Sequence, residues 1–207
     1  MGKSNDVEDI LEYLRKTIAT AWRGHEDFVV WLVKELKPKV IVELGTELGF
    51  STFVLAAPKI GTVYGIDSFK GDEFTRVSGT KKGFMKSLKE VKKRFGINNV
   101  KVIEGRFSDI VKKWKLPIDI LHIDGSHRYK DVKEDFENWS KFVKEDGVIL
   151  MHDVYVPSDK RFGVEKFYKE IDPPKLRFFH SHGLGVVSKD EKLIKKIAKK
   201  STNVKYV

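Results

Sequence analysis

Short apolar stretches rich in β-branched residues alternate with amphipathic segments from about residue 25 onward. The stretches predicted to be core strands are Val40–Leu44, Thr62–Ile66, Val100–Ile103, Ile118–Ile123 and Gly147–Met151. Such alternation is typical of a mainly parallel sheet that helices cover on both faces. The sequence therefore predicts a doubly wound α/β fold.

The pattern changes after the fifth predicted strand. Residues 162–171 are predicted to be a helix, and the apolar stretches Leu176–Phe179 and Leu184–Val187 are predicted to be strands joined by the short connection His180–Gly183. Strands joined so closely are antiparallel, because a parallel pair needs a crossover of about a dozen residues. The sheet is thus predicted to be Rossmann-like and mostly parallel, with a terminal antiparallel hairpin.

Two further helical regions are predicted, one before the main domain and one before the fifth strand. Residues 1–24 are predicted to form a leading helical segment that breaks at Trp22–Gly24, and residues 25–207 to form the main domain. A second helix, before the fifth strand, carries one apolar stripe that ends before Gly147 and consists of Tyr129, Val132, Phe136, Trp139 and Val143.

Composition narrows the class of protein. The chain lacks cysteine, which excludes disulfides, thiolate zinc sites and cysteine nucleophiles. It has neither a signal-peptide pattern nor a long apolar run, so we expect a cytoplasmic protein without a membrane span. The absence of glutamine beside many lysines and glutamates suggests a thermophilic source. The net charge of +10 fits either a nucleic-acid partner or a solvated surface. The lysines are spread along the chain rather than clustered, which favours a solvated surface over a nucleic-acid site.

A glycine-bearing turn follows the first predicted strand, where open α/β sheets bind nucleotides. The carboxylates of Glu43 and Glu47 flank this turn and would repel a pyrophosphate, whereas they would attract the sulfonium and ammonium groups of S-adenosylmethionine (SAM). We therefore predict a SAM site. The residues assigned to it here are Glu43, Gly45, Thr46, Gly49 and Ser51.

The ends of the second and third strands complete the predicted cofactor site. Asp67, 24 residues after Glu43, stands where an acidic residue captures both ribose hydroxyls, and Ser68 follows it. Ser108 or Asp109 would bind the amino group of adenine. Alone, Asp67 could merely cap a turn and Asp109 begin a helix. Beside the glycine turn, we interpret Asp67 as a cofactor residue and leave Asp109 open.

The fourth and fifth strands end in polar side chains that would border the same crevice. Asp124 and Asp153 could hold Mg²⁺ or Mn²⁺, which would lower the pKa of an acceptor hydroxyl. His127 or His152, acting with Asp124, could take the hydroxyl proton. We predict Asp124, His127 and His152 as catalytic residues and Asp124 and Asp153 as the metal site.

Each of these residues also has a simpler interpretation. Asp124 would bind the amino group of SAM, His127 would pack locally at a helix start, and His152 would be a core histidine. We expect His122 to be structural, because it lies within a buried strand. His180 and His182 either overhang the crevice or only decorate the hairpin.

Several motifs, in this order, resemble class I SAM-dependent methyltransferases of the macrocin O-methyltransferase-like type, which include forms associated with glycosyltransferases. The stretches that carry the resemblance are 22–25, 31–33, 42–46, 67–72, 121–127, 151–154 and 180–186. The resemblance implies a seven-stranded sheet, SAM at the first two strand ends and O-methylation of a sugar-like hydroxyl. Metal-dependent relatives carry paired acidic residues after the fifth strand, and this chain has His152 and Asp153 there.

The expected partners are a small-molecule or glycan acceptor and a second copy of the chain in a homo-oligomer. An RNA ribose methyltransferase is the alternative enzyme, since it would use the positive charge. A non-catalytic SAM-binding module in a glycan-assembly complex is the alternative outside enzymes.

Overall fold

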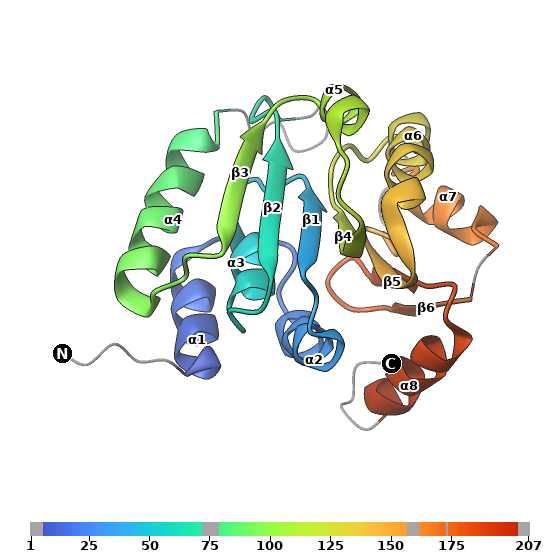
Figure 1. Ribbon diagram of the computed structural model, residues 1–207, viewed down its shortest axis with the longest axis horizontal. Coiled ribbons are helices and arrows are strands. Elements are labelled where there is room, and N and C mark those ends of the chain that lie inside the picture. Colours follow the sequence, from blue (N-terminus) through green and yellow to red (C-terminus); the bar gives the residue numbers. More distant parts are fainter. Residues whose placement is uncertain (1–5, 72–78, 157–161, 173, 203–207) are drawn as a thin grey trace.

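The structure is a computed structural model that describes residues 6–71, 79–156, 162–172 and 174–202 (Figure 1). A seven-stranded sheet forms its centre, in the strand order β3-β2-β1-β4-β5-β7-β6. The first five strands are parallel, and β7 runs antiparallel to both β5 and β6. The predicted Rossmann-like fold with a terminal antiparallel hairpin is therefore confirmed.

The strands are β1 Val40–Leu44, β2 Thr62–Asp67, β3 Val100–Glu104, β4 Ile118–Ile123, β5 Val143–His152, β6 Lys175–Phe178 and β7 Leu184–Val187. The α-helices are α1 Val7–Thr17, α2 Glu26–Leu36, α3 Phe50–Ala56, α4 Lys81–Phe95, α5 Phe107–Ile110, α6 Tyr129–Trp139, α7 Val164–Glu170 and α8 Glu191–Thr202. Short 3₁₀ turns, η1 Val111–Lys113 and η2 Ser140–Phe142, follow α5 and α6.

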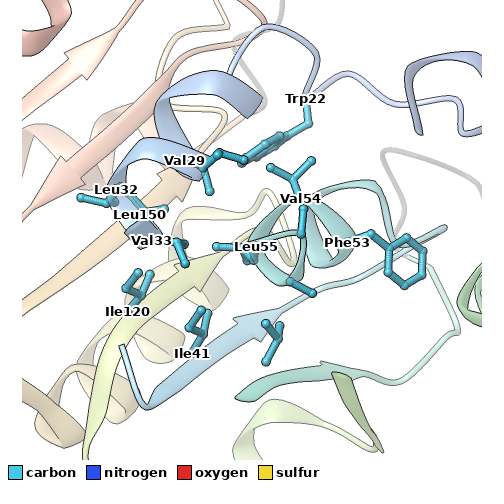
Figure 2. Packing of buried hydrophobic residues seen from close by; sticks show 14 of the residues in the cluster. Trp22, Val29, Leu32, Val33, Ile41, Phe53, Val54, Leu55, Ile120 and Leu150 are labelled. Carbon is cyan, nitrogen blue, oxygen red and sulfur yellow. The ribbon is translucent and has the colours of Figure 1, made fainter. Parts of the chain in front are cut away.

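Helices bury both faces of the sheet. One core cluster joins α1, α2, α3, α4 and α8 to one face, and Figure 2 shows side chains of α2 and α3 packed over Ile41 and Ile120. The other cluster joins α6 and α7 to the opposite face, which carries Val42 and Leu121. Neighbouring strand residues thus point to opposite faces, and both faces are apolar, as expected for a parallel sheet.

Some predicted boundaries are wrong. Helix α6 ends at Trp139, and Val143 begins β5 rather than closing the helical stripe. The predicted helix over residues 162–171 is α7, Val164–Glu170, and β6 ends one residue before Phe179. Asp72, the last residue of one stretch that carries the family resemblance, lies outside the described residues. None of the helices that the structure describes is long and apolar enough to span a membrane.

Candidate active site

A cavity of about 650 Å³ opens at the carboxyl ends of the parallel strands. It lies where the strand order reverses between β1 and β4, the place where open α/β sheets bind ligands. The residues predicted from the sequence that line it are Gly45, Thr46, Ser51, Asp67, Ser68, Asp124, His127, His152 and Asp153. The predicted residues that the structure describes outside this lining are Glu43, Gly49, Ser108 and Asp109.

The turn after β1 needs glycine for reasons internal to the protein. Gly45 has a φ of +91°, and a Cβ atom there would lie 2.0 Å from the carbonyl oxygen of Asp124. Gly49 has a φ of +93°, and its Cβ would lie 2.5 Å from the ring of Phe53. Positive φ and these short distances both exclude side chains. Both glycines are predicted from the sequence as cofactor residues, whereas in the structure protein packing already requires them.

The Asp67 carboxylate fastens this turn to the end of β2. Its Oδ2 accepts hydrogen bonds from the backbone N–H groups of Thr46 (2.8 Å) and Glu47 (3.0 Å) and from the Thr46 hydroxyl (3.2 Å). Its Oδ1 accepts one from the N–H of Phe69 (2.7 Å). A carboxylate has about four acceptor positions. Asp67 thus stands where the sequence predicts a ribose contact, with room at Oδ1 for one hydroxyl rather than two.

Glu43 lies beneath the cavity in a fully buried chain of polar groups. The indole N–H of Trp22 donates to His122 Nε2 (3.3 Å), so His122 donates from Nδ1 to the Glu43 carboxylate (3.0 Å). The Thr52 hydroxyl donates to the same carboxylate. The predicted direct contact of Glu43 with the cofactor is therefore not the arrangement found. The cause is the strand pleat, because Glu43 shares the face of Ile41, which α2 and α3 cover.

The segment after β3 presents an aromatic ring to the cavity. Phe107 lines the wall, while Asp109 is 63% exposed and pairs with Lys112 at 3.2 Å. Sequence reasoning considered only the polar neighbours, Ser108 and Asp109, and missed Phe107. An aromatic residue three positions after the end of β3 is a signal that could have indicated it, because such a ring can pack against a planar base.

His152 sits between two carboxylates at the ends of β4 and β5. Its Nδ1 lies 3.3 Å from Asp124 Oδ1 and 3.2 Å from Asp153 Oδ2. Its Nε2 lies 2.9 Å from the carbonyl oxygen of Ser181. His127 joins the group through Nε2, 3.0 Å from Asp153 Oδ2. The predicted convergence of Asp124, His127, His152 and Asp153 at one edge of the sheet is therefore what the structure has.

The charges of this group assign a role to His152. Burial of the ring disfavours its charged form, but Asp153 and Asp124 outweigh burial and hold the pKa of His152 well above its ordinary value. Burial also acts on Asp153, yet His152 holds the pKa of that carboxyl well below its usual range. His152 is therefore an imidazolium whose N–H groups are all bonded, with no lone pair to accept a proton. His152 therefore fits the role of a counter-ion to Asp124 and Asp153 rather than that of the predicted base.

Two further imidazoles contact Asp153. The His127 side chain is 10% exposed and packs against the ring of Phe162, with centroids 4.4 Å apart. The His182 side chain is 50% exposed, lines the cavity and places Nδ1 3.1 Å from Asp153 Oδ1. From the sequence, His182 could lie at the crevice or on the surface of the hairpin, and the structure brings it to the crevice.

The N-terminal segment forms part of the same wall. Residues 19–22, between α1 and α2, line the cavity, and this contribution was missed because a short connection has no periodicity. The Ser181 hydroxyl donates to the carbonyl oxygen of Arg23, and His25 Nε2 donates to the carbonyl oxygen of Ser181 (3.3 Å). Burial and then the charge of His152 lower the pKa of His25 to about 2, so His25 is neutral.

The predicted metal site can be tested against this geometry. Asp124, His152 and Asp153 each offer a ligand atom, all within 4.8 Å of one another, and they are the set among the described residues that could hold an ion. Both carboxylates already contact His152 Nδ1, and Asp153 also accepts from His127 and His182. An ion would have to displace these imidazole protons. The arrangement therefore fits an imidazolium better than a metal ion, and we derive no step through a metal.

Comparison with known proteins identifies the family. The chain belongs to the methyltransferase-domain family, whose sequence profile matches residues 42–154, from β1 to the residue after Asp153. The uncharacterized protein y4gI of Sinorhizobium fredii is 35% identical over 184 residues, which cover 81% of this chain. The chain spans only 19% of the length of that relative.

Solved structures share the fold. An O-methyltransferase from Bacillus cereus, in complex with S-adenosylhomocysteine (SAH), superposes with a TM-score of 0.61 at 20% identity, over 91% of this chain and 93% of the other. The O-methyltransferase TomG from Streptomyces achromogenes, involved in tomaymycin synthesis and in complex with SAM, gives a TM-score of 0.61 at 16% identity over 90% of each chain. At these identities the likeness establishes the fold.

Proposed function

We propose that this methyltransferase-family chain uses SAM to methylate a hydroxyl group of a small acceptor. The observation that carries the proposal is that one cavity is lined both by Asp67 and the turn at Gly45 and by the cluster of Asp124, His152 and Asp153. A methyl transfer needs a donor and an acceptor side by side. The structures of the two O-methyltransferases that share this fold hold SAH and SAM, which supports the choice of cofactor.

We assign the cofactor along one side of the cavity. The turn at Gly45, Thr46 and Ser51 would hold the methionine part, Asp67 and Ser68 the ribose, and Phe107 the adenine ring. Phe107 thus takes the position that the sequence analysis gave to Ser108 or Asp109. The other side, at the ends of β4 and β5, is left for the acceptor.

The charge of the lining supports a cationic cofactor and an uncharged acceptor. Carboxylates line the cavity at Glu47, Asp67, Asp124 and Asp153, and within the described residues the lining includes no lysine or arginine. Phosphate groups bind where such cations are present. The lining therefore weighs against the RNA alternative, in spite of the net charge of +10.

A sugar hydroxyl is the acceptor that we favour. The support for this choice is the resemblance to macrocin O-methyltransferase-like enzymes, together with the uncharged acceptor that the carboxylates favour. Calorimetric titration with SAM and SAH tests the cofactor, and methyl transfer from radiolabelled SAM to methyl glycosides, catechols and a short RNA tests the acceptor. Failure to bind SAM or SAH would remove the proposal, and labelled RNA would revive the alternative enzyme.

Two results would redirect the proposal. Tight SAM binding without turnover of any acceptor would favour the non-catalytic SAM-binding module. The metal prediction is tested by dialysis against a chelator, followed by Mg²⁺ or Mn²⁺. We expect activity to survive the chelator, because His152 already supplies the cation between Asp124 and Asp153. Loss of activity that Mg²⁺ or Mn²⁺ restores would favour the metal instead.

A further inference from the structure

Resting on the proposed function, we infer that His182 is the base that takes the proton of the acceptor hydroxyl, with Asp153 orienting its ring. Sugar hydroxyls do not ionise at neutral pH unaided, so a base must remove the proton as the new bond forms. His182 comes from the connection between β6 and β7, outside the residues 42–154 that the family profile matches.

The contact with Asp153 decides which nitrogen of His182 is available. An ionised carboxylate only accepts hydrogen bonds, so Nδ1, 3.1 Å from Asp153 Oδ1, carries the proton. In the neutral ring Nε2 then holds the lone pair. This is the tautomer that a general base needs, and the carboxylate also fixes the orientation of the ring.

Accessibility separates His182 from the other two candidates. Its side chain is 50% exposed, against 10% for His127 and 4% for His152. The His127 ring is covered by Phe162, and both ring nitrogens of His152 already have partners, Nδ1 at Asp124 and Asp153 and Nε2 at the carbonyl oxygen of Ser181. Of the three imidazoles around Asp153, His182 therefore combines a lone pair with access for an acceptor.

The backbone around this pair is strained. Asp153, Ser181 and His182 are non-glycine residues with φ of +61°, +49° and +63°. Left-handed backbone costs free energy in residues with a side chain, and such strain gathers at functional sites. These left-handed residues let the connection between β6 and β7 lie against the end of β5.

Hydrogen bonds from three segments hold the strained connection. The carbonyl oxygen of Ser181 accepts from His152 Nε2 (2.9 Å) and His25 Nε2 (3.3 Å), and the carbonyl oxygen of His182 accepts from the N–H of Tyr155 (2.8 Å). The charged His152 thus fixes the loop, and the loop presents His182. This gives the two histidines different tasks.

The step balances without a further reactant. A lone pair of the acceptor oxygen forms a bond to the SAM methyl carbon, the carbon–sulfur bond breaks, and its electron pair stays on sulfur to give neutral SAH. The hydroxyl proton moves to His182 Nε2. The resulting imidazolium returns this proton to solvent, which the half-exposed side chain contacts.

The test uses His182→Asn in the full chain, because asparagine tolerates left-handed backbone better than most residues. We expect kcat for methyl glycosides to fall about 10²- to 10⁴-fold, the usual range for loss of a general base, with SAH affinity within threefold of the parent. With 4-nitrocatechol, a much stronger acid, we expect a smaller loss. His180→Asn, on the same connection but outside the lining, is the control and should keep most of the activity.

A merely structural role would give equal losses with both acceptors, and that result would overturn the inference, as would parent-like rates in His182→Asn. Nitrogen NMR of ¹⁵N-histidine-labelled protein bound to SAH checks the geometry without any acceptor. We expect neutral His182 to carry its proton on Nδ1, and a proton on Nε2 would refute the assignment. If the parent binds SAM but methylates none of the probes, the proposed function fails first and the inference with it.

Discussion

Replacing Asp67 would separate two tasks that the structure gives to one carboxylate. Its four hydrogen bonds hold the turn of Thr46 and Glu47 and the backbone of Phe69, and Oδ1, which accepts only one of them, is the atom that we assign to a ribose hydroxyl. At about 0.5–1.5 kcal/mol for each net hydrogen bond, losing the three backbone contacts in Asp67→Ala should cost about 1.5–4.5 kcal/mol of unfolding free energy.

The variant Asp67→Asn distinguishes the hydrogen bonds that hold the turn from the proposed contact with the ribose. Its single amide oxygen can keep the contacts to Thr46 and Glu47, so we expect about half the loss of stability of Asp67→Ala. A lost charge-assisted bond to one ribose hydroxyl should weaken SAH binding about tenfold or more. Asp109→Asn, at an exposed carboxylate outside the cavity lining, is the matched control.

Calorimetry with SAH and with an SAH analogue that lacks the ribose 2′ and 3′ hydroxyls gives the decisive comparison. If Asp67 contacts the ribose, Asp67→Asn should lose much more affinity for SAH than for the analogue. Equal losses for the two ligands would show that Asp67 acts only through the turn. Chemical denaturation of the same variants measures independently how much the hydrogen bonds between Asp67 and the turn contribute to the free energy of unfolding.

Three other changes test separate parts of the structure. Gly45→Ala should lower the melting temperature and SAM affinity together, because its Cβ would lie 2.0 Å from the Asp124 carbonyl oxygen; a folded variant with unchanged calorimetry would contradict this. Phe107→Ala should weaken SAM binding about tenfold through lost contact with adenine and should also lower the melting temperature, because the ring packs against the core; unchanged affinity would remove that assignment. Burial, then the charge of Asp131, raises the pKa of Asp135 to about 7, so the folded state holds a proton that the unfolded state releases and stability falls as pH rises from about 4 to 7. Asp135→Asn should therefore stabilise the protein by about 1–3 kcal/mol in denaturation at pH 8 and hardly at pH 4, and a gain that does not vary with pH would contradict the buried charge.

The sheet could be predicted from the sequence because its strands are buried and β-branched, and because the ends of parallel strands meet at one edge. The residues at which helices end were harder to predict from the sequence. Val143 continues the spacing of the α6 stripe, so periodicity alone assigned it to the helix, whereas η2 ends the helical path at Phe142 and β5 begins.

Site residues that follow strand ends were predicted, whereas those whose place depends on side-chain direction or loop shape were wrongly placed or left open. Glu43 stands beside the glycine turn in sequence, but the pleat turns it toward α2 and α3, and both faces of this sheet are apolar, so no polar side marked its direction. The position of His182 at the cavity depends on left-handed backbone at Ser181 and His182. The residue types do not predict this conformation, because non-glycine residues rarely adopt it.

The proposed chemistry also explains why a cation is built into an acidic site. Asp124 and Asp153 alone would place two negative charges at the acceptor and make removal of a hydroxyl proton harder. With His152 charged between them, the three groups sum to one negative charge. In the reaction the positive charge of the sulfonium disappears as His182 becomes an imidazolium beside Asp153. The net charge of the cavity is then the same before and after the methyl transfer, so the carboxylates can stabilise the cation in both positions without any rearrangement of the protein.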